Sequence, residues 1–127
     1  MSTSQSSLAQ SAAAAPELDP EQIAMLRGLR KGTLLPTLLR TYREQVPQQL
    51  AAIDAALAAG DVAAVGGVAH SLKSASYSVG AKRLGDLCAA IEAAARGGDA
   101  AGVAGGCTGL APAWALLQPE IEGHLSP

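Results

Sequence analysis

The chain has 127 residues, of which 49% are hydrophobic, and a formal net charge of −2. Such a length favours one domain, and the apolar content is ample for a core. Its nine basic residues are scattered, whereas nucleic-acid-binding and membrane-surface proteins cluster theirs. No apolar run is identified that reaches the roughly 18 residues of a membrane span. We therefore expect neither nucleic acid nor membrane among the partners.

The first fifteen residues, rich in Ser, Gln and Ala, have no Lys or Arg and no apolar segment, unlike a signal peptide. We interpret residues 1–17 as a flexible segment, either a free end or the linker from a larger protein such as a hybrid kinase. Residues 18–127 then form the domain. Without a recognisable export signal we expect a cytoplasmic protein and no oxidising compartment. Cys88 and Cys107, which lie on apolar helical stripes, are therefore expected to be buried free thiols.

A short first helix is predicted after Asp19. Aspartate is a favoured N-cap, Pro20 suits the first helical position, and Gln22 stands three residues after the cap. Gly32 marks the end of this segment. The residues expected to face inward are Ile23, Leu26 and, at the edge of the pattern, Leu29.

A long second helix is expected to be capped by Thr33 and to end at Gly60. Pro36 is tolerable in its first turn, whereas the interior Pro47 should bend it. Its apolar stripe consists of Leu35, Leu38, Leu39, Tyr42, Val46, Leu50, Ile53 and Leu57.

Three further helices are predicted downstream. Asp61 caps the third, which turns near Gly80, and Asp99 repeats this pattern before the last helix. Pro112 and Pro119 interrupt the last helix and leave its continuity open. No segment alternates with the period of a strand. The predicted fold is all-α, an antiparallel up-down-up-down four-helix bundle with a short N-terminal lid helix.

His70 lies on the polar face of the third predicted helix. At about 100° per residue, the apolar stripe lies on the opposite side of the helix. Lys73, Ser74 and Tyr77 follow at i+3, i+4 and i+7, and Gly66 and Gly67 precede it, so all five share its face. The stripe consists of Val65, Val68, Leu72, Ala75, Ser76 and Val79.

Several chemistries are poorly supported by the residues near His70. No His, Cys, Asp or Glu lies one turn away, so no metal site is expected. Ser74 has no nearby carboxylate to complete a nucleophilic triad. Gly66-Gly67 lacks the rest of a phosphate-loop signature, and no nucleotide site is recognisable, so self-phosphorylation from ATP is not expected. What remains near His70 is a neutral imidazole that can act as a nucleophile.

The segment Ala69-His70-Ser71-Leu72-Lys73, followed by Gly80-Ala81, Leu84, Cys88 and Glu92, resembles the histidine-containing phosphotransfer (HPt) domain of bacterial phosphorelays. Ser74 replaces the usual glycine and Ile91 a leucine. The resemblance covers residues 18–125. It implies that His70 carries a phosphoryl group, with Lys73 as electrostatic helper. Gly66, Gly67, Ser74 and Tyr77 are expected to form a docking rim.

The resemblance also implies the partners. A receiver domain of a response regulator or hybrid histidine kinase would donate from an aspartyl-phosphate, and another would accept. The chain needs no cofactor of its own, because the receiver supplies Mg²⁺, and it is expected to act as a monomer. Two other interpretations remain open: a helical bundle that binds a signalling partner without phosphotransfer, and a purely structural bundle.

Overall fold

The computed structural model describes residues 16–126, and helices form its regular structure. The all-α prediction is confirmed. The predicted flexible segment 1–17 lies outside the described residues except for Pro16 and Glu17. The helices are α2 (Pro20–Arg27), the 3₁₀ turn η1 (Leu29–Gly32), α3 (Leu34–Ala58), α4 (Val62–Ser78), α5 (Lys82–Arg96), α6 (Ala100–Cys107) and α7 (Leu110–Leu125).

Three aspartates begin helices as predicted. The side chains of Asp19, Asp61 and Asp99 each accept a backbone hydrogen bond from the first turn of α2, α4 and α6, respectively. These bonds satisfy amide groups that have no partner within the helix. The Asp61 cap therefore fixes where α4, the helix that carries His70, begins.

Thr33 occupies the N-cap position of α3 as predicted, but its side chain does not cap the helix. Its hydroxyl donates to the Arg30 carbonyl and makes no capping bond to α3. The cause is η1, where Arg30 and Lys31 have φ of 51° and 56° and Gly32 has φ of 83°. This left-handed run brings the chain back on itself before α3 begins. The same turn leaves Leu29 44% exposed rather than inward.

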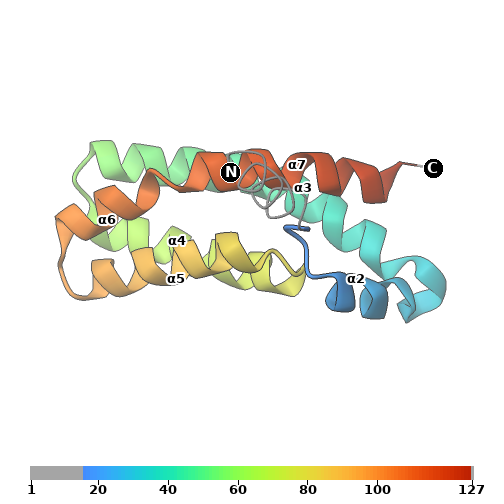
Figure 1. The fold of residues 1–127 in the computed structure, drawn as a ribbon. Helices are drawn as coiled ribbons and strands as arrows, with labels where there is room; N and C mark the ends of the chain where they lie inside the picture. Colours follow the sequence, from blue (N-terminus) through green and yellow to red (C-terminus); the bar gives the residue numbers. More distant parts are fainter. Residues whose placement is uncertain (1–15, 127) are drawn as a thin grey trace, which may run out of the picture.

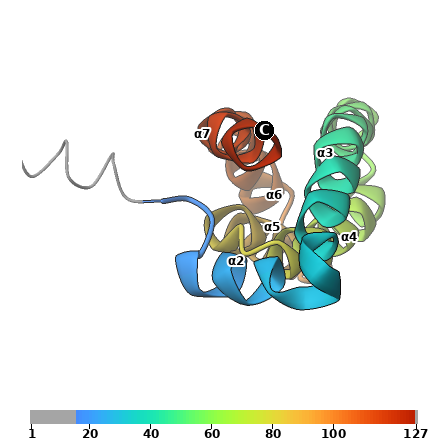
Figure 2. The same cartoon turned by 90° about the vertical axis from the view of Figure 1, so that its right-hand side faces the viewer.

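The long helices lie along one axis (Figures 1 and 2). Helix α4 packs between α3 and α5, while α7 contacts both α3 and α5. Helix α2 crosses the end of this assembly next to the α4–α5 turn. There the Asp19 amide donates to the Gly80 carbonyl at 2.9 Å, and Gln22 Nε2 donates to the Tyr77 carbonyl at 2.7 Å.

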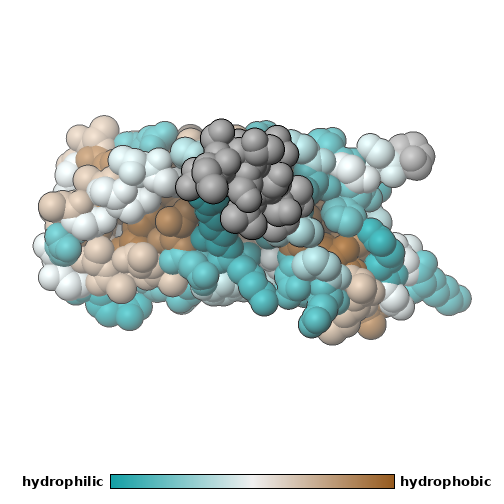
Figure 3. Space-filling view, viewed as in Figure 1, coloured by the Kyte–Doolittle hydropathy of each residue, from teal (hydrophilic) through white to brown (hydrophobic). Residues whose placement is uncertain are grey.

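The residues before α2 are also held by α7. The Glu120 carboxylate accepts hydrogen bonds from the backbone amides of Glu17 and Leu18. A hollow of about 250 Å³ lies beside this contact, and Figure 3 shows apolar surface in the same region, between α2 and the upper helices. Its lining residues are Pro16, Leu18, Pro20, Ile23, Ala24, Arg27, Glu120 and His124.

The predicted last helix is two helices. The break falls between Cys107 and Leu110, just before Pro112, which has no amide hydrogen to donate to the Thr108 carbonyl. Pro119, in contrast, is accommodated inside α7.

The segment Ala100–Leu125 is nevertheless long and apolar enough for a membrane span, with mean hydropathy of 1.3. The sequence interpretation did not identify it. In the structure the break divides it, and several of its large side chains are buried in the core, namely Leu110, Trp114, Leu117 and Ile121, whereas Leu116 is 48% exposed.

A buried polar pair lies in the aliphatic core between α3 and α4. The hydroxyls of Tyr42 and Ser76 are 2.8 Å apart, and the Tyr42 ring meets Trp114 edge-on with centroids 5.7 Å apart. Burial raises the pKa of Tyr42 well above its usual value. The pair satisfies both hydroxyls and fixes α4 against α3.

Replacing one of the two hydroxyls leaves its partner buried and unpaired, whereas replacing both does not. Tyr42→Phe leaves the Ser76 hydroxyl unpaired, so we expect a loss of about 1–3 kcal/mol in the free energy of unfolding. Ser76→Ala should cost a similar amount. In the double variant no hydroxyl is left unpaired, so its loss should be smaller than the sum of the two. Urea titration measures all three, and strictly additive losses would contradict the pairing.

Candidate functional site

His70 projects from the exposed side of α4, as predicted. Its side chain is 60% exposed, whereas Val65, Ala69 and Leu72 on the same helix are fully buried. Because α4 begins at its Asp61 cap and buries this stripe, the imidazole is directed away from the core.

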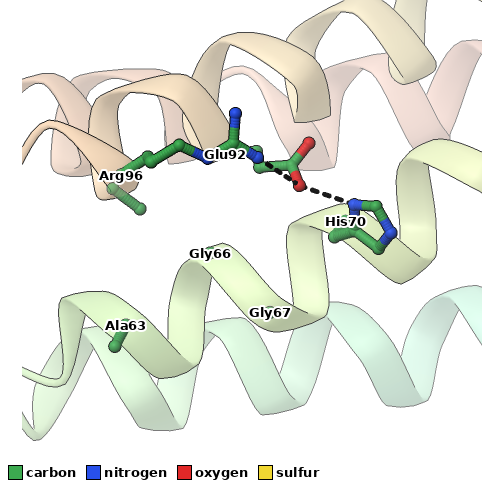
Figure 4. A pocket seen from close by; sticks show the side chains of 7 residues that line it. Ala63, Gly66, Gly67, His70, Glu92 and Arg96 are labelled. Carbon is green, nitrogen blue, oxygen red and sulfur yellow. Dashed lines mark hydrogen bonds and ion pairs between the residues drawn. The ribbon is translucent and has the colours of Figure 1, made fainter.

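The structure brings a carboxylate to His70 from the neighbouring helix. Glu92 on α5 lies with Oε2 2.5 Å from His70 Nδ1, and with Oε1 2.6 Å from Lys73 Nζ. Figure 4 shows Glu92 reaching across from α5 to the imidazole. Glu92 belongs to the family pattern, but no role was predicted for it, because spacing along one helix does not reveal a partner on the next helix. The sequence signal that could have indicated this contact is the position of Glu92 directly after Ile91, which was predicted to face inward.

The contact with Glu92 determines which imidazole nitrogen can react. The hydrogen bond from Lys73, joined by that from His70, lowers the pKa of Glu92 despite its partial burial, so its carboxylate is ionised and can only accept. His70 Nδ1 must then donate its hydrogen. In the neutral ring the lone pair lies on Nε2, the nitrogen that faces away from Glu92 in Figure 4. Nε2 is therefore the ring nitrogen with a lone pair free to act as a nucleophile.

Two cations surround the single carboxylate. The Lys73 side chain is 26% exposed and joined to Glu92, and Arg96, one turn further along α5, contacts Glu92 Oε2 at 3.2 Å. The cluster therefore carries one more positive than negative charge beside His70. That surplus favours the approach of an anionic group.

A hollow of about 370 Å³ borders His70 between α4 and α5, lined by Ala63, Gly66, Gly67, His70, Glu92, Ala95 and Arg96. The two glycines differ within it. A Cβ atom on Gly67 would meet nothing within 4 Å, whereas one on Gly66 would lie 2.8 Å from the Ala95 Cβ. Gly67 thus leaves open space beside the histidine, and Gly66 allows α4 to approach α5 closely.

The remaining predicted rim residues lie further along the same face. Ser74 is exposed. Tyr77 is 38% exposed, and its hydroxyl donates to Asp86 Oδ1 on α5 at 2.6 Å. All the predicted site residues therefore lie on one side of α4.

Other reactive side chains in the described residues lie apart from this site. Cys88 and Cys107 are free thiols as predicted, but only Cys88 is fully buried, whereas Cys107 is half-buried. Burial raises the pKa of Cys88 to about 12, so it remains protonated. His124 Nδ1 accepts from Arg27 at 2.8 Å near the end of α7. Within residues 16–126, no group of three or more His, Cys, Asp or Glu side chains is placed to hold a metal.

Comparison with known proteins gives two matches. A family model described as the Hpt domain matches residues 37–122. The chain is also similar to the crystal structure of histidine-containing phosphotransfer protein B (HptB) from Pseudomonas aeruginosa PAO1, with 28% identity and a TM-score of 0.82. That match covers 88% of this chain and 96% of the other. The search of curated proteins finds no match.

The two glycines offer a matched pair of substitutions. Gly67→Ala should raise the free energy of unfolding by up to about 1 kcal/mol, because alanine favours helix and the added methyl meets open space. Gly66→Ala makes the same chemical change but forces α4 and α5 apart, so it should destabilise the fold. Thermal melting of both variants tests this. Equal shifts would show that the helices do not pack as described.

The Glu92 contacts predict a specific acid sensitivity. A lowered pKa means that the folded state takes up a proton less readily than the unfolded state, so protonation favours unfolding. The contribution of Glu92 is present above the ordinary glutamate value of 4.5 and is lost as the pH falls through the lower folded-state value. Urea titrations between neutral pH and pH 3 should therefore show a shallower acid loss for Glu92→Gln. Parallel profiles would argue against an ionised Glu92 in this cluster.

Proposed function

This chain belongs to the Hpt domain family, and from that premise we propose that it takes a phosphoryl group onto His70 from one receiver domain and passes it to another. The family match confirms the resemblance seen in the motif and identifies the chain as a histidine phosphotransfer protein. The direction of transfer and the identity of the receivers belong to the proposal. The observation that carries it is an exposed His70 whose Nδ1 is engaged by Glu92.

The proposed step requires no proton transfer by the protein. Nε2 attacks the phosphorus of an aspartyl-phosphate, an N–P bond forms, and the P–O bond to the aspartate breaks as the carboxylate leaves. Because Nδ1 keeps its hydrogen, the ring becomes cationic, and Glu92 stabilises that charge through its existing hydrogen bond. The reverse sequence delivers the phosphoryl group to a second aspartate.

The surrounding cations support this chemistry. Phosphoryl transfer depends on in-line positioning and on neutralising the charge of the equatorial oxygens. Lys73 and Arg96 supply positive charge next to the ring, and Glu92 limits how far either can move. We propose that Lys73 is the electrostatic helper and that Mg²⁺ in the receiver provides the remaining neutralisation.

The docking surface is proposed to be the face of α4 that surrounds His70, with Gly66, Gly67, Ser74 and Tyr77 as its rim. Gly67 and Ser74 leave the approach to the ring open. Gly66 supports the rim indirectly, since it lets α5 bring Glu92 close. A cytoplasmic, monomeric protein remains part of this proposal.

We also propose the up-down-up-down arrangement, with α6 and α7 together as the fourth member and α2 as the lid. The short turns between α3, α4 and α5 are typical of antiparallel neighbours. The contacts of α7 with α3 and α5 close the bundle, and the bonds from Asp19 and Gln22 seat α2 across one end.

Incubation with a phosphorylated receiver domain should label this chain at His70. The label should be acid-labile and base-stable, as expected for a phosphoramidate, and absent from His70→Gln. Lys73→Ala should still be labelled but more slowly, because the nucleophile is intact while part of the positive charge is lost.

Phosphate-affinity gels measure the rates, and thermal melting checks that each variant is folded. Undiminished labelling of His70→Gln would contradict His70 as the carrier. Failure of every receiver from the same cell to label the wild-type protein would contradict phosphotransfer and favour a non-catalytic bundle.

A further inference from the structure

Tyr77 is the large exposed aromatic residue on the His70 face. In the described residues, the large apolar side chains that remain exposed are Met25, Leu29, Tyr77 and Leu116, and of these only Tyr77 belongs to α4. It follows His70 by seven residues, so it lies on the same face about 10 Å further along the helix. A partner that covers His70 reaches it, because a typical interface of about 800 Å² per side has a radius near 16 Å.

The Tyr77 ring is fixed rather than free. It lies directly over Gly85 on α5, where a Cβ atom would come within 3.0 Å of three ring atoms. Its hydroxyl donates to Asp86 at 2.6 Å, and this bond raises the pKa of the phenol. The ring is thus supported by the glycine backbone below and tied at its tip, while 38% of the residue remains exposed.

A fixed aromatic side chain is well suited to recognition. An exposed tyrosine normally loses rotamer freedom when a partner immobilises it, and that loss weakens binding. Here Gly85 and Asp86 have already removed most of that freedom. Aromatic residues held in this way are frequent among the few side chains that dominate the affinity of an interface.

We propose that Tyr77 is a preorganised anchor for the receiver domain and a determinant of which receivers this protein serves. This inference rests on the proposed phosphotransfer function. Tyr77 takes no part in the chemistry, since Nε2 and its Glu92 partner lie two turns away. Its contribution is to the affinity of the docked complex.

The test separates docking from chemistry by using two phosphoryl donors. A phosphorylated receiver must dock before transfer, whereas phosphoramidate reaches Nε2 as a small molecule. Tyr77→Ala should raise the half-saturating receiver concentration about tenfold and leave labelling by phosphoramidate unchanged. Leu116→Ala, on α7, is the matched control and should change neither.

A second set of variants tests the support of the ring. Gly85→Ala pushes the Tyr77 ring off α5 and should weaken receiver docking although Tyr77 itself is intact. The double variant Tyr77→Ala/Gly85→Ala has no ring to displace, so it should dock no worse than Tyr77→Ala alone. Tyr77→Phe keeps the ring over Gly85 and should have an intermediate effect. Thermal melting verifies that each variant is folded.

The possible outcomes are distinct. An unchanged half-saturating concentration for Tyr77→Ala, with His70-dependent transfer intact, would overturn the role of Tyr77 and leave the proposed function standing. Equal slowing with receiver and phosphoramidate would show a structural role and also overturn it. If no receiver labels wild-type His70 while phosphoramidate does, the proposed function fails and this inference fails with it.

Discussion

The close approach of α4 and α5 is the constraint on which the site depends. His70 and Lys73 belong to one helix, and Glu92 and Arg96 to the other, so the cluster exists only where the two helices are in contact. Small residues make that contact possible, because Gly66 admits the methyl group of Ala95 and Gly85 admits the ring of Tyr77. The helix-to-helix spacing is therefore a functional property as well as a packing property.

Because Glu92 accepts the hydrogen bond from His70 Nδ1, the histidine does not need to exchange protons in the proposed step. In a general-base mechanism the side chains exchange protons during each turnover, and their pKa values must match the working pH. In the proposed step the hydrogen on Nδ1 stays in place while the phosphoryl group arrives at and leaves Nε2. The role proposed for the protein is to orient one ring and to hold charge next to it, which is the kind of preorganisation that accounts for much of the catalytic effect in polar sites.

The features that were predicted correctly from the sequence are those that depend on residues close together in the chain. The aspartate caps, the buried stripe of α4 and the exposure of His70 all follow from residues within one or two turns of each other, and the structure agrees. The exceptions involve longer range or unusual backbone. Glu92 reaches His70 from 22 positions away. The left-handed run before Gly32 includes Arg30 and Lys31, residue types that do not predict this backbone. The apolar period continues unchanged across the break before Leu110. Periodicity describes which face is buried, but not which helices meet.

The division of the reactive cluster between two helices makes correct assembly a condition of reactivity. A chain in which α4 is helical but α5 has not docked would still display a histidine, yet nothing would select its tautomer or hold the cations beside it. Such a chain would also lack the surface formed by both helices together, so under the proposed function it would bind receiver domains poorly. For the proposed phosphotransfer, the division of the cluster between two helices means that only molecules in which α4 and α5 have docked can take part.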